Sequence, residues 1–228
     1  MMKSVGILGG MGPASSGHFF DEFITALNMN GIVQDEDFPE IVHYSIPLPD
    51  WNETGFKIKS KIGNDRLKDA LTKCILSLET LGVDIIAIPC NTIHYFYDEM
   101  QICTSVPILN IIEETKKYIE QQGFNKIALY SSRSTRDLCL YDSIGILKTS
   151  DEEQDIVDDV ILQVMSGNVD IKHTFKKLIE DKIAKDGIDA VILGCTELPI
   201  LIDSNDVGVN IINTTKILVD KLTQEVLT

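Results

Sequence analysis

The sequence predicts a two-domain α/β protein, in which two pseudo-symmetric domains each contain an open parallel sheet covered by helices. The first observation behind this prediction is that apolar, strand-like runs alternate with helical patterns along all 228 residues. The second is that parts of the first half recur in the same order in the second half. We expect residues 1–110 plus 212–228 to form the first domain and residues 111–211 the second, with the functional site in the cleft between them.

The repeat is clearest around two cysteines. The segments GVDIIAIPCNT and GIDAVILGCTE share Gly, Asp and Cys in register, so that Cys195 follows Cys90 by 105 positions. Two weaker matches support the repeat. NIIEETK recurs as NIINTTK after 100 positions, and VGILGG resembles IALYSS after 122 positions. Because the three matches keep their order along the chain, we interpret them as an internal duplication.

The first half reads as alternating strands and helices. A strand over 4–10 enters a glycine-rich turn, and residues 14–28 have the apolar spacing of a helix. A second strand covers 41–49, where prolines end it. An amphipathic helix over 66–82 stops at its final glycine and leads into the strand that carries Cys90.

The second half follows the same plan. Its expected elements are a strand at 126–131, helices at 151–167 and 173–187, and a strand at 188–195. The acidic run at 151–159 is interpreted as a solvated helix face with favourable charges in its first turn. A helix at 111–121 leads into this half, and its counterpart at 213–226 is expected to return to the first domain.

Composition and charge exclude several classes of protein. A hydrophobic content of 44% allows a sizeable buried core. The net charge of −15 argues against binding to nucleic acids or to anionic membranes, because both require a basic face. No apolar run approaches the roughly 20 residues of a membrane-spanning helix, and residues 1–12 lack the features of a secretion signal. We therefore expect a cytoplasmic protein with a small-molecule ligand.

The five cysteines are odd in number, scattered, and free of any C-x-x-C motif. A disulfide framework or a zinc ribbon is therefore not expected, and reduced thiols fit best. Cys74 lies within a helical pattern and is assigned to the core. Cys103 and Cys139 have no repeat partner and are interpreted as incidental.

Cys90 and Cys195 each end a buried strand, and ligands of open parallel sheets bind outside the carboxyl ends of strands. Each is followed by polar residues that suit a helix start, which lowers a thiol's pKa and favours the thiolate. Two matched thiols on opposite sides of one ligand suit the inversion of a stereocentre by proton transfer. That reaction needs a base on one face and an acid on the other.

Three segments, GILGGMGP, PCNTIH and ILGCTELP, closely resemble the cofactor-independent aspartate/glutamate racemase family. The resemblance spans essentially the whole chain. It implies two pseudo-symmetric α/β domains with the active site between them, an amino-acid racemase activity with aspartate as the first candidate substrate, and no pyridoxal phosphate. Cys90 and Cys195 are then the catalytic pair. We also expect a homodimer and no metal ion.

The resemblance further implies a set of residues around the substrate. Asn91, Thr92 and Thr196 would hold its amino and carboxylate groups, and His94 and Glu197 would support the two cysteines. Additional donors for a carboxylate would come from Met11, Gly12, Ser132, Thr135 and Lys172.

One segment departs from the family pattern. Members specific for aspartate carry Ile-Pro-Asp-Arg-Thr after the second strand, and the arginine grips a substrate carboxylate. This chain has IPLPDWNET, with Trp51 in place of that arginine. The side-chain carboxylate of aspartate could instead be held by another basic residue, such as Lys57, Lys59 or Lys172. Glutamate, broad-specificity and hydantoin racemases, decarboxylases and other isomerases of the same fold remain alternatives.

Three other interpretations of these motifs are weaker. Cys90 and His94 have the spacing of a metal pair, but no third ligand lies nearby in the sequence. GGMGP resembles a dinucleotide-binding loop, yet Ser15 stands at the last glycine position of that pattern. A non-catalytic amino-acid-binding relative is expected to lose one cysteine, and this chain keeps both.

Overall fold

A computed structural model of the chain describes residues 2–47 and 65–228. The described residues form two compact units. The first contains residues 2–47, 65–114 and 215–228, and the second contains residues 115–214. Within the described residues after position 64, the chain passes from one unit to the other at 114/115 and at 214/215, four and three residues after the positions expected from the sequence.

The described part of the first unit contains a parallel three-stranded sheet in the order β2-β1-β3. Its strands are β1 (Val5–Gly9), β2 (Ile41–Ser45) and β3 (Ile85–Ala87). Every residue of β1 and β3 is buried, as expected for parallel strands with helices on both faces. The strand expected at 41–49 ends at Ser45, shortly before the prolines.

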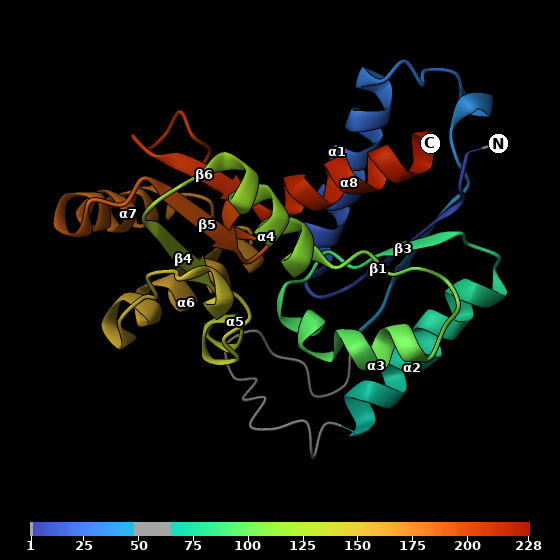
Figure 1. Cartoon of the computed structure of the whole chain (residues 1–228), viewed down its shortest axis with the longest axis horizontal. Helices are drawn as coiled ribbons and strands as arrows, with labels where there is room; N and C mark the ends of the chain where they lie inside the picture. The colour runs from blue at the N-terminus through green and yellow to red at the C-terminus, as the bar shows by residue number, and fades with distance from the viewer. Residues whose placement is uncertain (1, 48–64) are drawn as a thin grey trace. The chain divides into compact units, whose positions relative to one another are not determined.

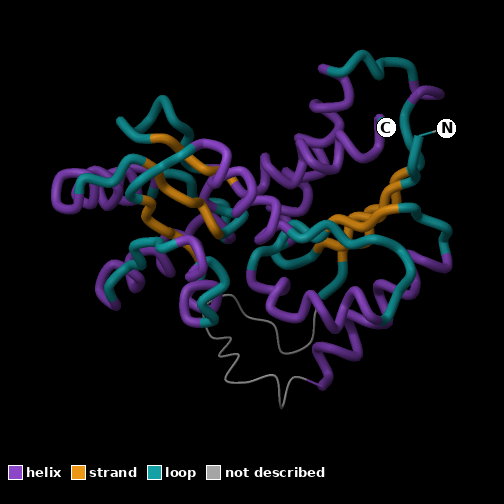
Figure 2. The backbone as a smooth tube through the Cα atoms, viewed as in Figure 1, coloured by secondary structure: helices purple, strands orange, loops and turns teal. Residues whose placement is uncertain are grey.

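Helices surround this sheet (Figures 1 and 2). They are α1 (Pro13–Met29), η2 (Thr92–Phe96), α3 (Tyr97–Ile102), α2 (Asp65–Thr80) and α8 (Thr214–Leu227), with a short turn η1 (Asp35–Asp37). α1 begins with a proline. An N–H at the first position of a helix has no partner within the helix, so proline loses no hydrogen bond there. α8 belongs to this unit from its second residue onward, and Lys3 Nζ lies 2.9 Å from Glu225 Oε2 on that helix.

The second unit contains three parallel strands in the order β4-β5-β6. The strands are β4 (Ile127–Ser131), β5 (Ala190–Gly194) and β6 (Asn210–Asn213). The accompanying helices are α4 (Ile111–Gln122), α5 (Arg133–Asp137), α6 (Asp151–Met165) and α7 (Lys172–Asp186), with turns η3 (Asp142–Ile144) and η4 (Leu198–Ile200). The core of this unit lies between its sheet and the apolar faces of α6 and α7. The predicted α/β class with parallel sheets is confirmed.

The two sheets have the same strand order once isolated bridges are included. In the first unit, β1 pairs with β2 through Gly6 and Val42. In the second, β4 pairs at the equivalent place through Ala128 and Leu147. In the first unit β3 lies on the other side of β1, and in the second unit β5 lies on the other side of β4. The internal repeat of the sequence therefore corresponds to a repeat of backbone topology.

The repeated Gly-x-Asp motif has a structural role in both units. Its glycine ends a helix with a φ of 80° in one unit and 63° in the other, a conformation that favours glycine. The carboxylates of Asp84 and Asp189 then accept backbone N–H groups, at 2.8 Å from Ser4 and 3.0 Å from Lys126. Hydrogen bonds from the backbone of Ser4 and of Asn125 lower the pKa of Asp84 and Asp189, respectively. The motif thus fixes the start of the strand that carries each cysteine.

The structure corrects the register of one sequence match. Ile108 pairs beside β3 at the position where Ile211 pairs beside β5. The structural offset between these residues is therefore 103 positions, whereas NIIEETK and NIINTTK align at 100. Asn110 caps α4 by accepting backbone N–H groups, and the asparagine directly before α8 is Asn213. The letters NII coincide, but they begin a helix in one half and form a strand in the other.

Candidate active site

Cys90 lies just beyond the carboxyl end of β3, and its side chain is buried. Its backbone N–H donates to the carbonyl of Ile88 at 2.8 Å, so the chain turns sharply after the strand. The next residues, Asn91 and Thr92, are also buried and open the turn η2. A buried strand therefore holds the thiol, and two polar side chains follow it directly.

His94 ties this turn to the neighbouring segment of the same unit. Its Nδ1 lies 2.8 Å from the carbonyl oxygen of Cys90, and its Nε2 lies 3.2 Å from that of Leu109. The ring is buried and stacks on Tyr97. Burial lowers the pKa of His94, an effect that the two backbone hydrogen bonds oppose. His94 thus holds the backbone of Cys90 through its carbonyl oxygen.

Cys195 follows β5 directly, and its surroundings differ from those of Cys90. Its Sγ lies 3.0 Å from Oε2 of Glu197, and both side chains are buried. Thr196 Oγ1 donates to the same carboxylate oxygen at 3.3 Å. A carboxylate can accept the S–H hydrogen of a thiol, so Glu197 can bind and orient the thiol of Cys195.

The two cysteines occupy equivalent positions of the repeated fold. In the first unit, Val5 of the central strand pairs with Ile85. In the second, Ile127 pairs with Ala190. Each cysteine lies five positions beyond the second member of its pair. The equivalence of the cysteines therefore rests on strand register as well as on sequence similarity.

The loop after β1 contains Met11 and Gly12, and Gly12 is the N-cap of α1. Ser16 fixes this loop, because its buried hydroxyl accepts the N–H of Gly10 at 3.0 Å and donates to the carbonyl of Gly12 at 2.8 Å. Gly10 has a φ of 102°, and a Cβ there would lie 2.0 Å from the carbonyl oxygen of Ile46. Only glycine fits at that position.

The corresponding loop after β4 contains Ser132 and Thr135, which are buried. Ser132 is the N-cap of α5, and its hydroxyl accepts the N–H of Thr135 at 3.4 Å and donates to its Oγ1 at 3.3 Å. Since neighbouring parallel strands end at the same edge of a sheet, this loop lies at the edge that also carries Cys195 and Thr196. In the first unit, the same argument groups the loop after β1 with Cys90.

Lys172 is the first residue of α7, and its Nζ lies 2.7 Å from Asp206 Oδ1. The hydrogen bond from Lys172 lowers the pKa of Asp206. This lysine therefore already has a carboxylate partner. Trp51, Lys57 and Lys59 lie outside the described residues.

The other cysteines do not belong to this group. Cys74 is buried in α2, where burial raises the pKa of its thiol, as its assignment to the core predicts. Cys139 is exposed and Cys103 partly so. Within residues 2–47 and 65–228, no cluster of three His, Cys, Asp or Glu side chains could hold a metal ion. No helix in the described ranges is long and apolar enough to cross a bilayer.

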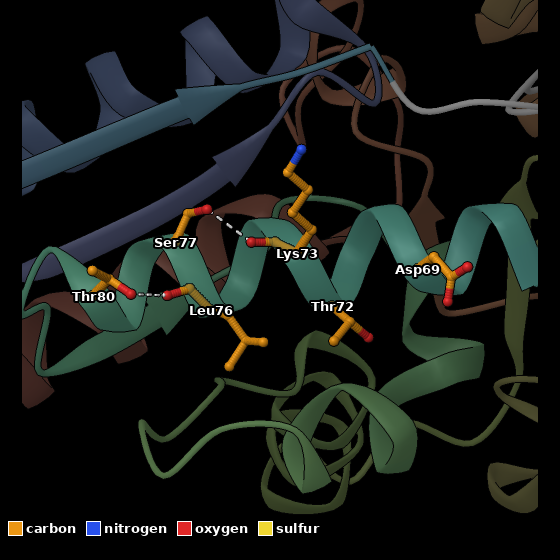
Figure 3. Close-up of a pocket in the computed structure, with 6 residues that line it drawn as sticks. All are labelled: Asp69, Thr72, Lys73, Leu76, Ser77 and Thr80. Atoms are coloured by element: carbon orange, nitrogen blue, oxygen red, sulfur yellow. Dashed lines mark hydrogen bonds between the residues drawn. The ribbon is translucent and has the colours of Figure 1, made fainter.

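A hollow of about 430 Å³ lies along α2 (Figure 3). It is lined by Asp69, Thr72, Lys73, Leu76, Ser77 and Thr80. All of these belong to one helix, and the hydroxyls of Ser77 and Thr80 donate to carbonyl groups of that helix. The hollow contains none of the residues that the sequence assigns to the site, and we therefore place the chemistry at the cysteine loops.

Comparison with known proteins agrees with this architecture. A model of the family described as Asp/Glu/Hydantoin racemase matches residues 8–222. The chain is 32% identical over 209 residues to the broad specificity amino-acid racemase RacX of Bacillus subtilis (strain 168), with 87% of each chain covered.

Two solved structures resemble the whole chain. An aspartate racemase homologue from Pyrococcus horikoshii OT3 has a TM-score of 0.80 and 28% identity, with 100% of both chains covered. The Picrophilus torridus aspartate racemase has a TM-score of 0.80 and 26% identity, covering 98% of this chain and 94% of that one. The chain therefore belongs to the Asp/Glu/hydantoin racemase family and is an isomerase that acts on amino acids.

Proposed function

We propose that this enzyme inverts the Cα centre of a free amino acid by a two-base proton transfer between Cys90 and Cys195, without pyridoxal phosphate. The observation that carries the proposal is the equivalent position of two buried cysteines beyond β3 and β5. A duplicated fold with a matched acid–base group in each half suits a reaction whose substrate and product are mirror images.

The proton balance of the proposed reaction is simple. A thiolate on one face of the substrate removes the Cα proton, and a thiol on the opposite face delivers its own proton to the carbon. After turnover the first cysteine is a thiol and the second a thiolate, so the pair is poised for the other enantiomer. Apart from these two protons, no group moves between enzyme and substrate, and neither is oxidised or reduced.

The negative charge that develops during proton removal spreads onto the substrate carboxylate, where hydrogen-bond donors stabilise it. In this proposal, Asn91, Thr92 and Thr196 hold the amino and carboxylate groups. The loops at Met11–Gly12 and at Ser132–Thr135 supply further donors. Glu197 accepts the S–H hydrogen of Cys195 until the substrate carbon takes it.

Aspartate is the first candidate substrate. Two structural relatives are described as aspartate racemases or homologues of one, and this supports the choice. Broad specificity is the second candidate, favoured by the relative from Bacillus subtilis and by Trp51, which replaces an arginine of the aspartate-specific pattern. We also propose that the enzyme is a cytoplasmic homodimer. Light scattering after gel filtration tests the oligomeric state.

The direct experiment incubates each enantiomer of a panel of amino acids with the enzyme in deuterated water. We expect deuterium at Cα and appearance of the opposite enantiomer, followed by NMR and by chiral chromatography. Loss of a carboxylate signal would instead indicate a decarboxylase, and binding without exchange would indicate a non-catalytic protein. Prior treatment with a chelator or with hydroxylamine should leave the rate unchanged.

A further inference from the structure

One face of α6 is directed at the loop after β4. Asp151 lies three and four residues before Gln154 and Asp155, and Asp158 lies four and three residues after them, so the four side chains share one side of the helix. All four bind the segment Ser131–Arg136. Asp151 and Asp155 remain exposed, as expected for a solvated face, and the same face also binds the neighbouring loop, which lies next to α6 in Figure 1.

Arginines of the loop make three of these contacts. Arg133 Nε donates to Asp158 at 2.8 Å, and its Nη2 donates to Asp155 at 2.6 Å. Arg136 Nη2 donates to Asp151 at 3.0 Å. The guanidinium groups can hold two carboxylates in fixed directions, so they fix the orientation of α5 as well as its distance from α6.

Gln154 makes the central contact, and its side chain is completely buried. Its Nε2 donates to the carbonyl of Ser131 at 2.9 Å and to Asp158 Oδ1 at 2.8 Å. Its Oε1 accepts the hydroxyl of Thr149 at 2.6 Å. Because the atom of Ser131 that Gln154 contacts is a carbonyl oxygen, which only accepts, the amide nitrogen must face the loop. A buried amide with three partners has a single orientation.

The loop needs this external support because α5 contains only five residues. Helices of this length are not stable by themselves. In the first unit, the corresponding loop is held from within its own long helix, by the hydroxyl of Ser16 in α1. In the second unit, the contacts from α6 do the equivalent work.

We propose that Gln154 is a positioning residue that, with the Arg133 ion pairs to Asp155 and Asp158, sets the place of Ser132 and Thr135 at the substrate. This proposal rests on the proposed function, in which these two side chains hold a substrate carboxylate. In this proposal Asn91, Thr92 and Thr196 meet the charge that develops at Cα, whereas the Ser132–Thr135 loop holds a carboxylate that is already fully charged in the bound substrate. Displacement of the loop should therefore raise KM and leave kcat nearly unchanged.

The test compares Gln154→Leu with Asp159→Asn, a matched control that removes an exposed carboxylate of the same helix. For Gln154→Leu we expect KM to rise about ten- to a hundredfold, the loss expected for one charged hydrogen bond, with kcat within about threefold. The control should match wild type. Arg133→Lys, a partly exposed site, provides a second variant if the buried one does not fold.

Hydrogen exchange of the backbone amides at 132–138 gives a second readout that needs no activity. In Gln154→Leu or Arg133→Lys, exchange should accelerate in this segment and stay unchanged in β5. Unchanged KM with unchanged exchange would overturn the proposal, and so would a fall in kcat alone or faster exchange throughout the unit. Absence of racemisation in wild type would refute the proposed function, while exchange would still decide whether α6 positions the loop.

Discussion

The sulfur of Cys195 lies 3.0 Å from a carboxylate oxygen of Glu197, and both groups are buried. Cys90 has a different neighbour, because His94 binds its backbone carbonyl. The two halves thus share their backbone plan, and in the second half a carboxylate lies beside the thiol. The effect of this carboxylate on Cys195 can be tested.

Glu197→Gln should increase the reactivity of Cys195. Glutamine keeps the size of the side chain but removes the negative charge that disfavours the thiolate. We expect alkylation of Cys195 by iodoacetamide at pH 7 to accelerate about tenfold, which corresponds to about 1.4 kcal/mol of stabilisation of the thiolate. Mass spectrometry of the peptides measures both sites in one sample. Alkylation of Cys90 serves as the internal control, and equal rates in wild type and variant would contradict the role given to Glu197.

Cys90→Ala and Cys195→Ala should each reduce racemisation by about 10²–10⁴-fold, the usual contribution of a positioned acid or base. Neither single variant can complete an inversion that needs groups on both faces. Turnover numbers measured by chiral chromatography in both directions test this. Cys74→Ala is the control, because that thiol is buried in α2, and it should retain wild-type turnover. Near-normal turnover in either site variant would be incompatible with the two-base mechanism.

Local patterns were sufficient to predict most of the fold. The helix expected at 14–28 forms at Pro13–Met29, and the one expected at 151–167 forms at Asp151–Met165. Apolar spacing and glycine stops determine such boundaries within a few residues of sequence. The placement of Cys90 and Cys195 at strand ends follows from the same local information, since each apolar run ends at its cysteine.

Contacts between distant segments could not be predicted in this way. Gln154 is one polar residue in a charged run, and nothing in the sequence around it indicates that it binds the carbonyl of Ser131. Ser16 supports the loop before Pro13, but serine at that spacing also fits an ordinary exposed helix position. Such partners become visible only when the strands are paired, because tertiary packing and not local propensity selects them.

The salt bridges of Glu225 should make the free energy of unfolding depend on pH in the acid range. Hydrogen bonds from Lys221, at 2.7 Å, and from Lys3, at 2.9 Å, lower the pKa of Glu225 from its ordinary 4.5 to about 2. A lowered pKa in the folded state contributes stability above pH 4.5, and this contribution is lost as pH falls toward 2. Water screens these partly exposed groups, so we expect a contribution of only about 1 kcal/mol at pH 7.

Urea unfolding of Glu225→Gln at pH 7 and at intermediate acid pH tests this expectation. The difference in free energy of unfolding from wild type should shrink as pH falls below 4.5. Asp220→Asn, which removes a carboxylate of an exposed pair within the same helix, should cost less than about 0.5 kcal/mol at pH 7. A constant difference from pH 7 down to pH 2 would show that the pairs with Lys3 and Lys221 do not account for the stability.

The final prediction concerns how the side-chain carboxylate of the substrate is held. The family resemblance implies an arginine at the position of Trp51, which lies outside the described residues. A missing charged hydrogen bond costs about 1.5–3 kcal/mol, which is about ten- to a hundredfold in affinity. We therefore expect weak turnover of aspartate by wild type and improvement in Trp51→Arg. The improvement should appear chiefly in KM, because the clamp binds the ground and transition states alike.

Lys172 is the rival for this role, and the structure gives a reason to expect that it is not the clamp. Its ammonium group is bound to Asp206 at 2.7 Å, so capturing a substrate carboxylate would require breaking an existing ion pair. Lys172→Ala should accordingly change KM for aspartate by less than about threefold, since a surface ion pair contributes only about 0–1 kcal/mol. Kinetics of wild type, Trp51→Arg and Lys172→Ala with aspartate and with an uncharged amino acid separate the two possibilities. Suppose that wild type turns over aspartate rapidly and that only Lys172→Ala loses this activity. If Lys172→Ala then still turns over the uncharged amino acid, the side-chain carboxylate is bound by Lys172.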